Sequence, residues 1–243
     1  MNGFSEARLR LSTLSEADLK SIAGKIETDG IYSVADFLSN DELLPLQAFV
    51  AAQIEQAGSE SVSLDREGVA SSGLGELVGS QEFTDFIRRL YSAGYGPPSS
   101  EFQDHRVLRC LTGKSAASHS MNFHYDSFMI TALIPIVVPS KGLRGDFLII
   151  PNTRHMRSRY LFNLVDKVLL DNALTQRRLR RRASNGGSVK RVSLTPGNLY
   201  LFWGYRSIHT NESVDEDMVR ATALFHFADP HANSFLKRQL GRS

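Results

Sequence analysis

Six short runs of β-branched, aliphatic and aromatic residues follow one another in the second half of the chain, and they constrain the fold more than any other feature. The runs cover residues 107–111, 129–138, 147–150, 189–194, 198–203 and 219–227. Runs of this length and composition are typical of strands, and several of them in series favour a sandwich or a barrel. The sequence therefore predicts a core that is mainly β.

The first hundred residues have helical patterns instead. Ser15 and Asp18 have the spacing of a capping box at the start of a helix. Asn40 and Asp41 can cap a second helix, and residues 82–91 are predicted to form a third. Because the apolar stripes of these helices need cover, we expect the helices to pack on the β core. The predicted fold class is α+β.

No internal repeat and no break in composition divides the 243 residues, so we predict a single domain. It has a mostly helical part over 1–99 and a β core over 100–228, followed by a C-terminal tail over 229–243. The β core contains an insertion at 156–188, which is predicted to be helical at first and then a basic loop.

Targeting segments and disulfide frameworks are not predicted. Apolar runs stay well short of the roughly 20 residues that a membrane-spanning helix needs, and the first ten residues lack an apolar signal core. We therefore expect a cytoplasmic protein without a membrane partner. Cys110 is the only cysteine, which excludes an internal disulfide and a cysteine-based zinc cluster. Any metal must be held by histidine and carboxylate.

Basic residues are concentrated in one segment. Fifteen consecutive positions without an acidic residue contain Arg177, Arg178, Arg180, Arg181, Arg182, Lys190 and Arg191. The net charge of the chain is +2, so removing these seven charges leaves −5 for the remainder. The segment lacks the interleaved aromatic residues that stack on bases. A solvated loop is therefore the favoured interpretation, and a nucleic-acid contact is the alternative.

A His-Tyr-Asp triplet at 124–126 is the sharpest chemical feature. Residues two apart on a strand share a face, so His124 and Asp126 are predicted to converge on one point. His209 follows much later, and Arg220 comes eleven residues after it on a predicted strand that places Thr222 on the same face. An arginine that faces an apolar interior needs an anion. A small dicarboxylate would provide one.

This order of residues resembles the iron(II)- and 2-oxoglutarate-dependent oxygenases, over about residues 100–228. Their double-stranded β-helix, a jelly-roll or cupin-like barrel, carries a His-x-Asp pair, a distant second His and a following Arg-x-Ser or Arg-x-Thr. The resemblance implies that His124, Asp126 and His209 hold Fe(II) as a facial triad. It also implies that 2-oxoglutarate and O2 take the remaining positions, with the far carboxylate of 2-oxoglutarate on Arg220 and Thr222.

The reaction that the resemblance implies is oxidative decarboxylation of 2-oxoglutarate to succinate and carbon dioxide, coupled to oxidation of a small molecule such as an amino acid or a biosynthetic intermediate. Halogenating members carry a small residue in place of the carboxylate, so Asp126 favours hydroxylation or desaturation. One departure from compact members is the 82-residue gap between Asp126 and His209, which the insertion explains.

Two alternatives and several roles stay open. The same chemistry could act on a nucleic acid or a protein through the basic segment, or the barrel could be a non-catalytic metal-binding module. Arg154, Trp203 and Asn211 are candidates for contact with the substrate. His226 shares the face of Arg220 and is predicted to be a core histidine, not a ligand. The substrate and the oligomeric state do not follow from the sequence.

Overall fold

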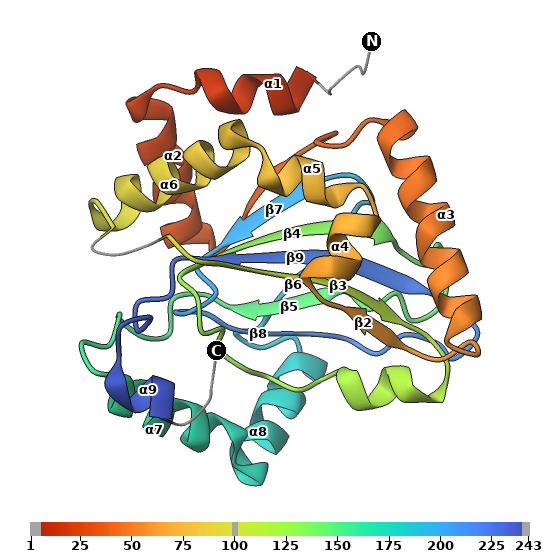
Figure 1. The fold of residues 1–243 in the computed structure, drawn as a ribbon. Coiled ribbons are helices and arrows are strands. Elements are labelled where there is room, and N and C mark those ends of the chain that lie inside the picture. The colour runs from red at the N-terminus through yellow and green to blue at the C-terminus, as the bar shows by residue number, and fades with distance from the viewer. Residues whose placement is uncertain (1–5, 99–101, 240–243) are drawn as a thin grey trace.

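The computed structural model describes residues 6–98 and 102–239 (Figure 1). Its strands are β1 (Tyr32–Val34), β2 (Val62–Leu64), β3 (Asp104–Leu111), β4 (Ile130–Val137), β5 (Phe147–Ile150), β6 (Lys190–Val192), β7 (Leu199–Phe202), β8 (Ile208–Asn211) and β9 (Arg220–Phe227). Its helices are α1 (Glu6–Thr13), α2 (Glu16–Asp29), α3 (Asn40–Gln56), α4 (Arg66–Ser71), α5 (Leu74–Gly79), α6 (Gln81–Tyr95), the 3-10 helix η1 (Lys114–His119), α7 (Tyr160–Asp171), α8 (Ala173–Ser184) and α9 (Phe235–Gln239).

Two antiparallel sheets form the β core. The larger has the strand order β1-β7-β4-β9-β3-β2, and the smaller has the order β6-β5-β8. Side chains of Leu133, Phe147 and Phe202 from the two sheets pack in one buried cluster, so the sheets form a sandwich with an interior between them. The first strand comes from the helical N-terminal part, which ties that part to the core.

Helices α1 to α6 lie on the outer side of the larger sheet (Figure 1). Side chains along β9 alternate between the two faces of this sheet, one of which is covered by the helices while the other faces the smaller sheet. Ala221, Ala223 and Phe225 join the core cluster under the helices. Arg220 and Thr222 point the other way, into the space between the sheets, where they line a pocket. The strand therefore buries an apolar face outward and presents a polar face inward, as its sequence predicts.

Capping boxes begin both α2 and α3. The first lies where the sequence predicts it, and the second is shifted by one residue. The Ser15–Asp18 capping box begins α2, and each side chain accepts a backbone hydrogen bond from the other residue. The second helix begins one residue earlier than expected because Ser39, not Asn40, provides its cap, in a second capping box with Glu42. Both helices thereby satisfy backbone donors that their first turns leave free.

The arginine-rich segment is a helix, and its prediction as a loop was wrong. The Asn172 side chain caps α8 by accepting a hydrogen bond from the backbone of Leu174. Arginine favours helices, and the buried residues Gln176, Leu179 and Ala183 recur at helical spacing along the same segment. The Asn-Gly-Gly turn at 185–187, which suggested a loop, follows the helix.

After residue 100 the strand boundaries agree with expectation within about three residues, with one omission. The short strand β8, which carries His209, was not predicted, because its four residues alternate too briefly to stand out from a loop. The predicted tail over 229–243 contains α9, and its residues 240–243 lie outside the described part of the chain. Within the described ranges, no helix combines the length and the apolar character that a bilayer span requires.

Candidate metal centre

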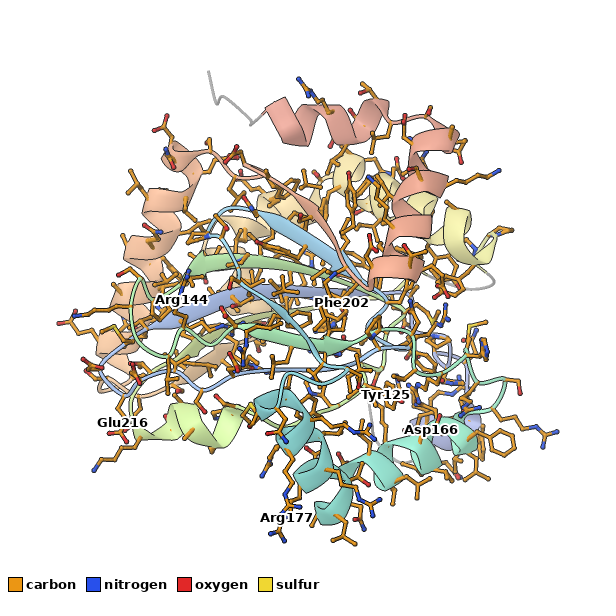
Figure 2. All side chains as sticks on the ribbon, turned by 180° about the vertical axis from the view of Figure 1, so that it is seen from behind. Tyr125, Arg144, Asp166, Arg177, Phe202 and Glu216 are labelled. Atoms are coloured by element: carbon orange, nitrogen blue, oxygen red, sulfur yellow. The ribbon has the colours of Figure 1, made fainter. Side chains whose placement is uncertain are left out.

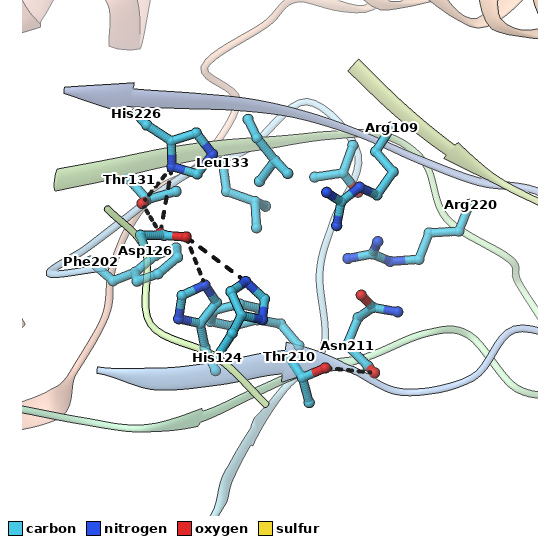
Figure 3. Close-up of a pocket in the computed structure, with 14 residues that line it drawn as sticks. Arg109, His124, Asp126, Thr131, Leu133, Phe202, Thr210, Asn211, Arg220 and His226 are labelled. Carbon is cyan, nitrogen blue, oxygen red and sulfur yellow. Dashed lines mark hydrogen bonds and ion pairs between the residues drawn. The ribbon is translucent and has the colours of Figure 1, made fainter. Parts of the chain in front are cut away.

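Three predicted ligands meet between the sheets. The Nε2 atom of His209 lies 3.4 Å from Oδ1 of Asp126, and Nε2 of His124 lies 3.8 Å from the same oxygen (Figure 3). The ligand atoms all lie within 4.8 Å of one another. Two neutral imidazoles and one carboxylate at this spacing match the 2-His-1-carboxylate set of non-haem iron(II) sites. The donors therefore fit a ferrous ion.

The backbone brings the ligands together by an unexpected route. Residues 121–128 form no regular strand, although His124 makes an isolated antiparallel bridge to His209. Each of these two N–H groups donates to the carbonyl of the other at 3.0 Å. The N–H of Asp126 donates to the carbonyl of Gly204 at 3.1 Å. A bridge of one residue pair, and not a strand, thus positions the His-x-Asp pair.

Hydrogen bonds fix the orientation of both imidazoles. Nδ1 of His124 lies 3.0 Å from the carbonyl oxygen of Asn122, and Nδ1 of His209 lies 3.0 Å from that of Ser207. A carbonyl only accepts, so each Nδ1 carries the proton and donates. The tautomer that results leaves the Nε2 lone pair free and directed at the site, as a metal ligand requires.

The pKa values of the three ligands are shifted in different ways by burial and by neighbouring charges. Burial, together with the charge of His209, lowers the pKa of His124 to about 4, so this imidazole is neutral near pH 7. Burial raises the pKa of Asp126, but the neighbouring His209 outweighs it and holds the pKa well below the usual value. Burial lowers the pKa of His209, and the Asp126 carboxylate reverses this effect and raises it. Asp126 is therefore an anion that attracts cations.

His226 supports the carboxylate from behind. Oδ2 of Asp126 accepts a hydrogen bond of 2.5 Å from the Thr131 hydroxyl, whose oxygen lies 3.1 Å from Nδ1 of His226. The same Nδ1 lies 3.5 Å from Oδ2 of Asp126. Oδ1 is thus left for the metal while Oδ2 is held in place. The sequence alternation placed His226 on the pocket face, and this was the signal that could have identified it as a supporting residue.

Two arginines form the other end of the pocket. Arg109 on β3 pairs with Thr222 on β9, and Arg220 lies two residues from Thr222, so all three side chains share one face. Figure 3 shows the two guanidinium groups directed into the same space. The Nε atoms of Arg109 and Arg220 and the hydroxyl of Thr222 are buried without a hydrogen-bond partner among the described residues.

An anion is the partner that these groups lack. Arg220 is only 4% exposed, and burial together with the charge of Arg109 lowers its pKa to about 10. Two cations side by side, Arg220 buried and Arg109 half-buried, are unfavourable unless a negative charge compensates them. Sequence reasoning identified Arg220 and Thr222 as the anion site but did not assign Arg109 to it. The cross-strand pairing with Thr222, which could not be read from one sequence, brings Arg109 into the site.

The three candidate substrate contacts lie in different places. Asn211 lines the pocket beside the arginines. The Arg154 guanidinium lies between the rings of Tyr125 and Tyr205, at 3.8 and 4.1 Å from their centroids, and is not among the residues that line the pocket. Trp203 is buried in the helix-covered core, where its ring packs edge-on against Tyr95.

The pocket that joins the two ends offers about 560 Å³ of space, part of it open to solvent. Its apolar walls are Leu133, Phe147, Phe202 and Leu224. A carboxylate and two imidazoles at one end and two guanidinium groups at the other suit a metal ion and a small dianion held together.

The sequence matches no protein-family model and no curated protein. Solved structures do match. SnoN, an alpha ketoglutarate dependent epimerase from nogalamycin biosynthesis, is 18% identical with a TM-score of 0.60, over 88% of this chain and 84% of that chain. SnoK, a carbocyclase from the same biosynthesis, is 16% identical with a TM-score of 0.57, over 94% and 92%. A prolyl hydroxylase from Trichoplax adhaerens is 12% identical with a TM-score of 0.56, over 95% and 97%.

A second structure of SnoN contains Fe3+, alpha ketoglutarate (2-oxoglutarate) and nogalamycin RO; it is 15% identical with a TM-score of 0.53, over 88% of this chain and 85% of that chain. These matches extend over most of the chain at low identity, so what they establish is the fold. The predicted fold class is confirmed. The chain has the double-stranded β-helix fold of the iron(II)- and 2-oxoglutarate-dependent oxygenases, and His124, Asp126 and His209 form a facial-triad arrangement within it.

Proposed function

We propose that this protein is a non-haem oxygenase that uses Fe(II), 2-oxoglutarate and O2 to hydroxylate a small molecule. One observation carries the proposal: a metal-ligand triad faces two adjacent guanidinium groups in one pocket, and the Nε atoms of both guanidinium groups are buried without a hydrogen-bond partner among the described residues. A purely structural metal site would need the triad alone. The second, cationic end of the pocket is explained if a dicarboxylate binds the metal with one carboxylate and the arginines with the other.

The residues of the chain then have distinct tasks. His124, Asp126 and His209 would hold iron on one side and leave its remaining positions toward the pocket. Arg220 and Arg109 would bind the far carboxylate, and Thr222 would donate its hydroxyl to it. When bound, iron and 2-oxoglutarate would activate O2, which would supply the oxidising equivalents for hydroxylation of a C–H bond of the substrate. The protein orients both and excludes competing water.

The walls of the pocket support the exclusion of water. Phe147 and Phe202 pack against the ring of His209, with centroids 5.8 and 4.9 Å away. Leu133 and Leu224 add apolar surface from the larger sheet, which also carries Phe202. This apolar lining lowers the local dielectric constant and so strengthens the electrostatic interactions of the protein side chains with iron and 2-oxoglutarate.

A small substrate and hydroxylation are the favoured outcome. Asp126 occupies the position that would have to be a small residue for a halide to bind. Related folds also host an epimerase and a carbocyclase. The proposal therefore rests on the site of this chain, and the product is to be established by experiment.

Anaerobic titration tests the chemistry. Fe(II) followed by 2-oxoglutarate should give a metal-to-ligand charge-transfer absorption in the wild-type protein and none in His124→Ala. Exposed His119→Ala is the matched control and should behave like wild type. No absorption in the folded wild type, or absorption that survives His124→Ala, contradicts the proposal. Succinate release measured across free amino acids and their derivatives then tests whether a small molecule is the substrate.

A further inference from the structure

Exposed apolar side chains are concentrated at one end of the molecule. Among the described residues, eleven large hydrophobic side chains are exposed, and nine of them lie within 156–174 or 235–236. These nine are Met156, Leu161, Phe162, Val165, Val168, Leu169, Leu174, Phe235 and Leu236. Monomeric soluble proteins rarely expose so continuous a group unless something binds there.

Helix α7 accounts for most of this surface. Leu161, Val165 and Val168 recur at the spacing of one helical face, and that face points away from the protein. The side that faces inward includes the polar residue Asn163, which is 2% exposed. The usual amphipathic pattern is thus partly reversed, although α7 is firmly attached: Asp166 accepts hydrogen bonds from Arg154 at 3.0 Å and from Arg157 at 2.7 Å.

A row of positive charges borders the apolar residues. Arg177, Arg178, Arg181 and Arg182 are exposed on α8, and none forms an ion pair within the described ranges. No acidic residue occurs anywhere from 172 to 211. Helices α7, α8 and α9 lie together at one end of the molecule, and Figure 2 shows Arg177 at its tip. We call the nine apolar residues and these four arginines the α7–α9 face.

Charge identifies the occupant of this face as anionic. A second copy placed on it by two-fold symmetry would bring two sets of four arginines together, and Asp171 is the one exposed carboxylate that α7 and α8 would offer them. The opposite half of the chain, residues 1–100, carries 15 acidic and 7 basic side chains. An anionic surface therefore repels that half and attracts the α7–α9 face, so the protein has one preferred orientation on it.

An anionic bilayer fits both properties of the face. Apolar side chains on a surface helix enter the boundary between headgroups and acyl chains, and arginines beside them contact lipid phosphates. A nucleic acid would use the arginines but would leave the nine apolar side chains in water. We infer that the α7–α9 face docks the protein on the surface of anionic membranes. The inference does not depend on the proposed reaction.

Vesicle binding tests the inference directly. The full-length protein is mixed with vesicles of phosphatidylglycerol and phosphatidylcholine, or of phosphatidylcholine alone, and the bound fraction is measured by co-sedimentation. We expect binding to the anionic vesicles that weakens as salt is added. Arg181→Gln/Arg182→Gln should lower the partition coefficient about fivefold for each charge removed. Val168→Ser/Leu169→Ser should also lower it.

Two control variants remove the same kinds of side chain at exposed positions outside the α7–α9 face. Lys20→Gln/Lys141→Gln removes two exposed charges, and Leu44→Ser/Leu143→Ser removes two exposed leucines away from the face. Both should bind like wild type. The inference is overturned if wild type does not bind anionic vesicles, or if control and face variants lose binding equally. It is also overturned if light scattering shows a dimer that Val168→Ser/Leu169→Ser dissociates while vesicle binding is absent. None of these readouts requires oxygenase activity.

Discussion

His124 and His209 hold each other in register, because each backbone N–H donates to the carbonyl of the other at 3.0 Å. Their rings lie 4.4 Å apart between centroids, and both Nε2 atoms face Asp126. The two ligands are separated by 84 positions along the chain, yet a single antiparallel bridge fixes their spacing. The backbone therefore fixes the relative positions of the two histidine ligands before any ion binds.

Iron affinity should fall as the solution becomes more acidic. The Asp126 carboxylate raises the pKa of His209 above its usual value, whereas the pKa of His124 is lowered to about 4. A metal binds only the neutral imidazole, so below the raised pKa of His209 a proton competes with the ion. Anaerobic Fe(II) titrations at about pH 6 and about pH 8 should show weaker binding at the lower pH. Equal affinity at both would contradict this.

Gly204→Ala should destroy the metal site without disturbing the fold elsewhere. A Cβ at position 204 would lie 2.1 Å from Oδ2 of Asp126 and 2.4 Å from the Thr131 hydroxyl, so the ligand carboxylate must move. We expect the loss of Fe(II) binding. Gly24→Ala is the control, since its Cβ would meet nothing within 4 Å, and alanine should stabilise α2 by about 0.5–1 kcal/mol. Retained iron binding in Gly204→Ala would disprove the steric argument.

Arg220→Met should separate stability from cosubstrate binding. The buried guanidinium has no partner for its Nε, so an apolar side chain of similar length removes a desolvation cost. Without 2-oxoglutarate, the thermal midpoint of the variant should equal or exceed that of wild type. Added 2-oxoglutarate should stabilise wild type only. The opposite pattern, a less stable variant that still responds to 2-oxoglutarate, would remove Arg220 from the anion site.

Arg109→Met tests whether the second arginine belongs to the same anion site. Loss of one charged partner of a buried carboxylate should weaken 2-oxoglutarate binding by about 2–5 kcal/mol while Fe(II) affinity stays close to that of wild type. Arg66→Met is the control, because Arg66 pairs with Asp104 at the surface, at 3.0 Å. Calorimetric titration of both ligands separates the effects. Unchanged 2-oxoglutarate affinity would show that Arg109 serves another group.

Sequence patterns predicted the structural features that depend on residues close together in the chain, such as strand alternation and helix capping. Strand alternation placed Arg220 and Thr222 on the pocket face, and the Ser15–Asp18 capping box marked the start of α2. The facial triad was predicted because these residues, in their order along the chain, resemble the motif of the iron(II)- and 2-oxoglutarate-dependent oxygenases. These features need no knowledge of which strands pair.

Contacts between distant segments were beyond this reasoning. Arg109 enters the site only because β3 pairs with β9 in one register. His226 reaches Thr131 and Asp126 only because β9 pairs with β4, with His226 opposite Thr131. The turn residues after α8 suggested a loop, although the buried side chains Leu179 and Ala183 favour a helix once a surface exists for them to cover. Tertiary packing decided each of these cases.

Gln176→Ala should weaken the metal site from a distance, because α8 holds the segment that carries two of the ligands. The Gln176 amide accepts a hydrogen bond from the N–H of Phe123 at 3.0 Å and donates to its carbonyl at 2.8 Å, in the manner of a neighbouring strand. Phe123 immediately precedes His124. Since both groups are buried, the substitution leaves them unsatisfied and should cost about 1–3 kcal/mol of stability.

The effect on function should exceed this loss of stability. Supporting residues of metal sites change affinity by about 10- to 100-fold, so Fe(II) affinity of Gln176→Ala should fall within that range. Gln56→Ala, at an exposed position of α3, is the matched control and should bind iron like wild type. Circular dichroism establishes that both variants are folded. If Gln176→Ala is folded and binds Fe(II) as tightly as wild type, α8 does not position His124, because the bridge to His209 alone is then sufficient.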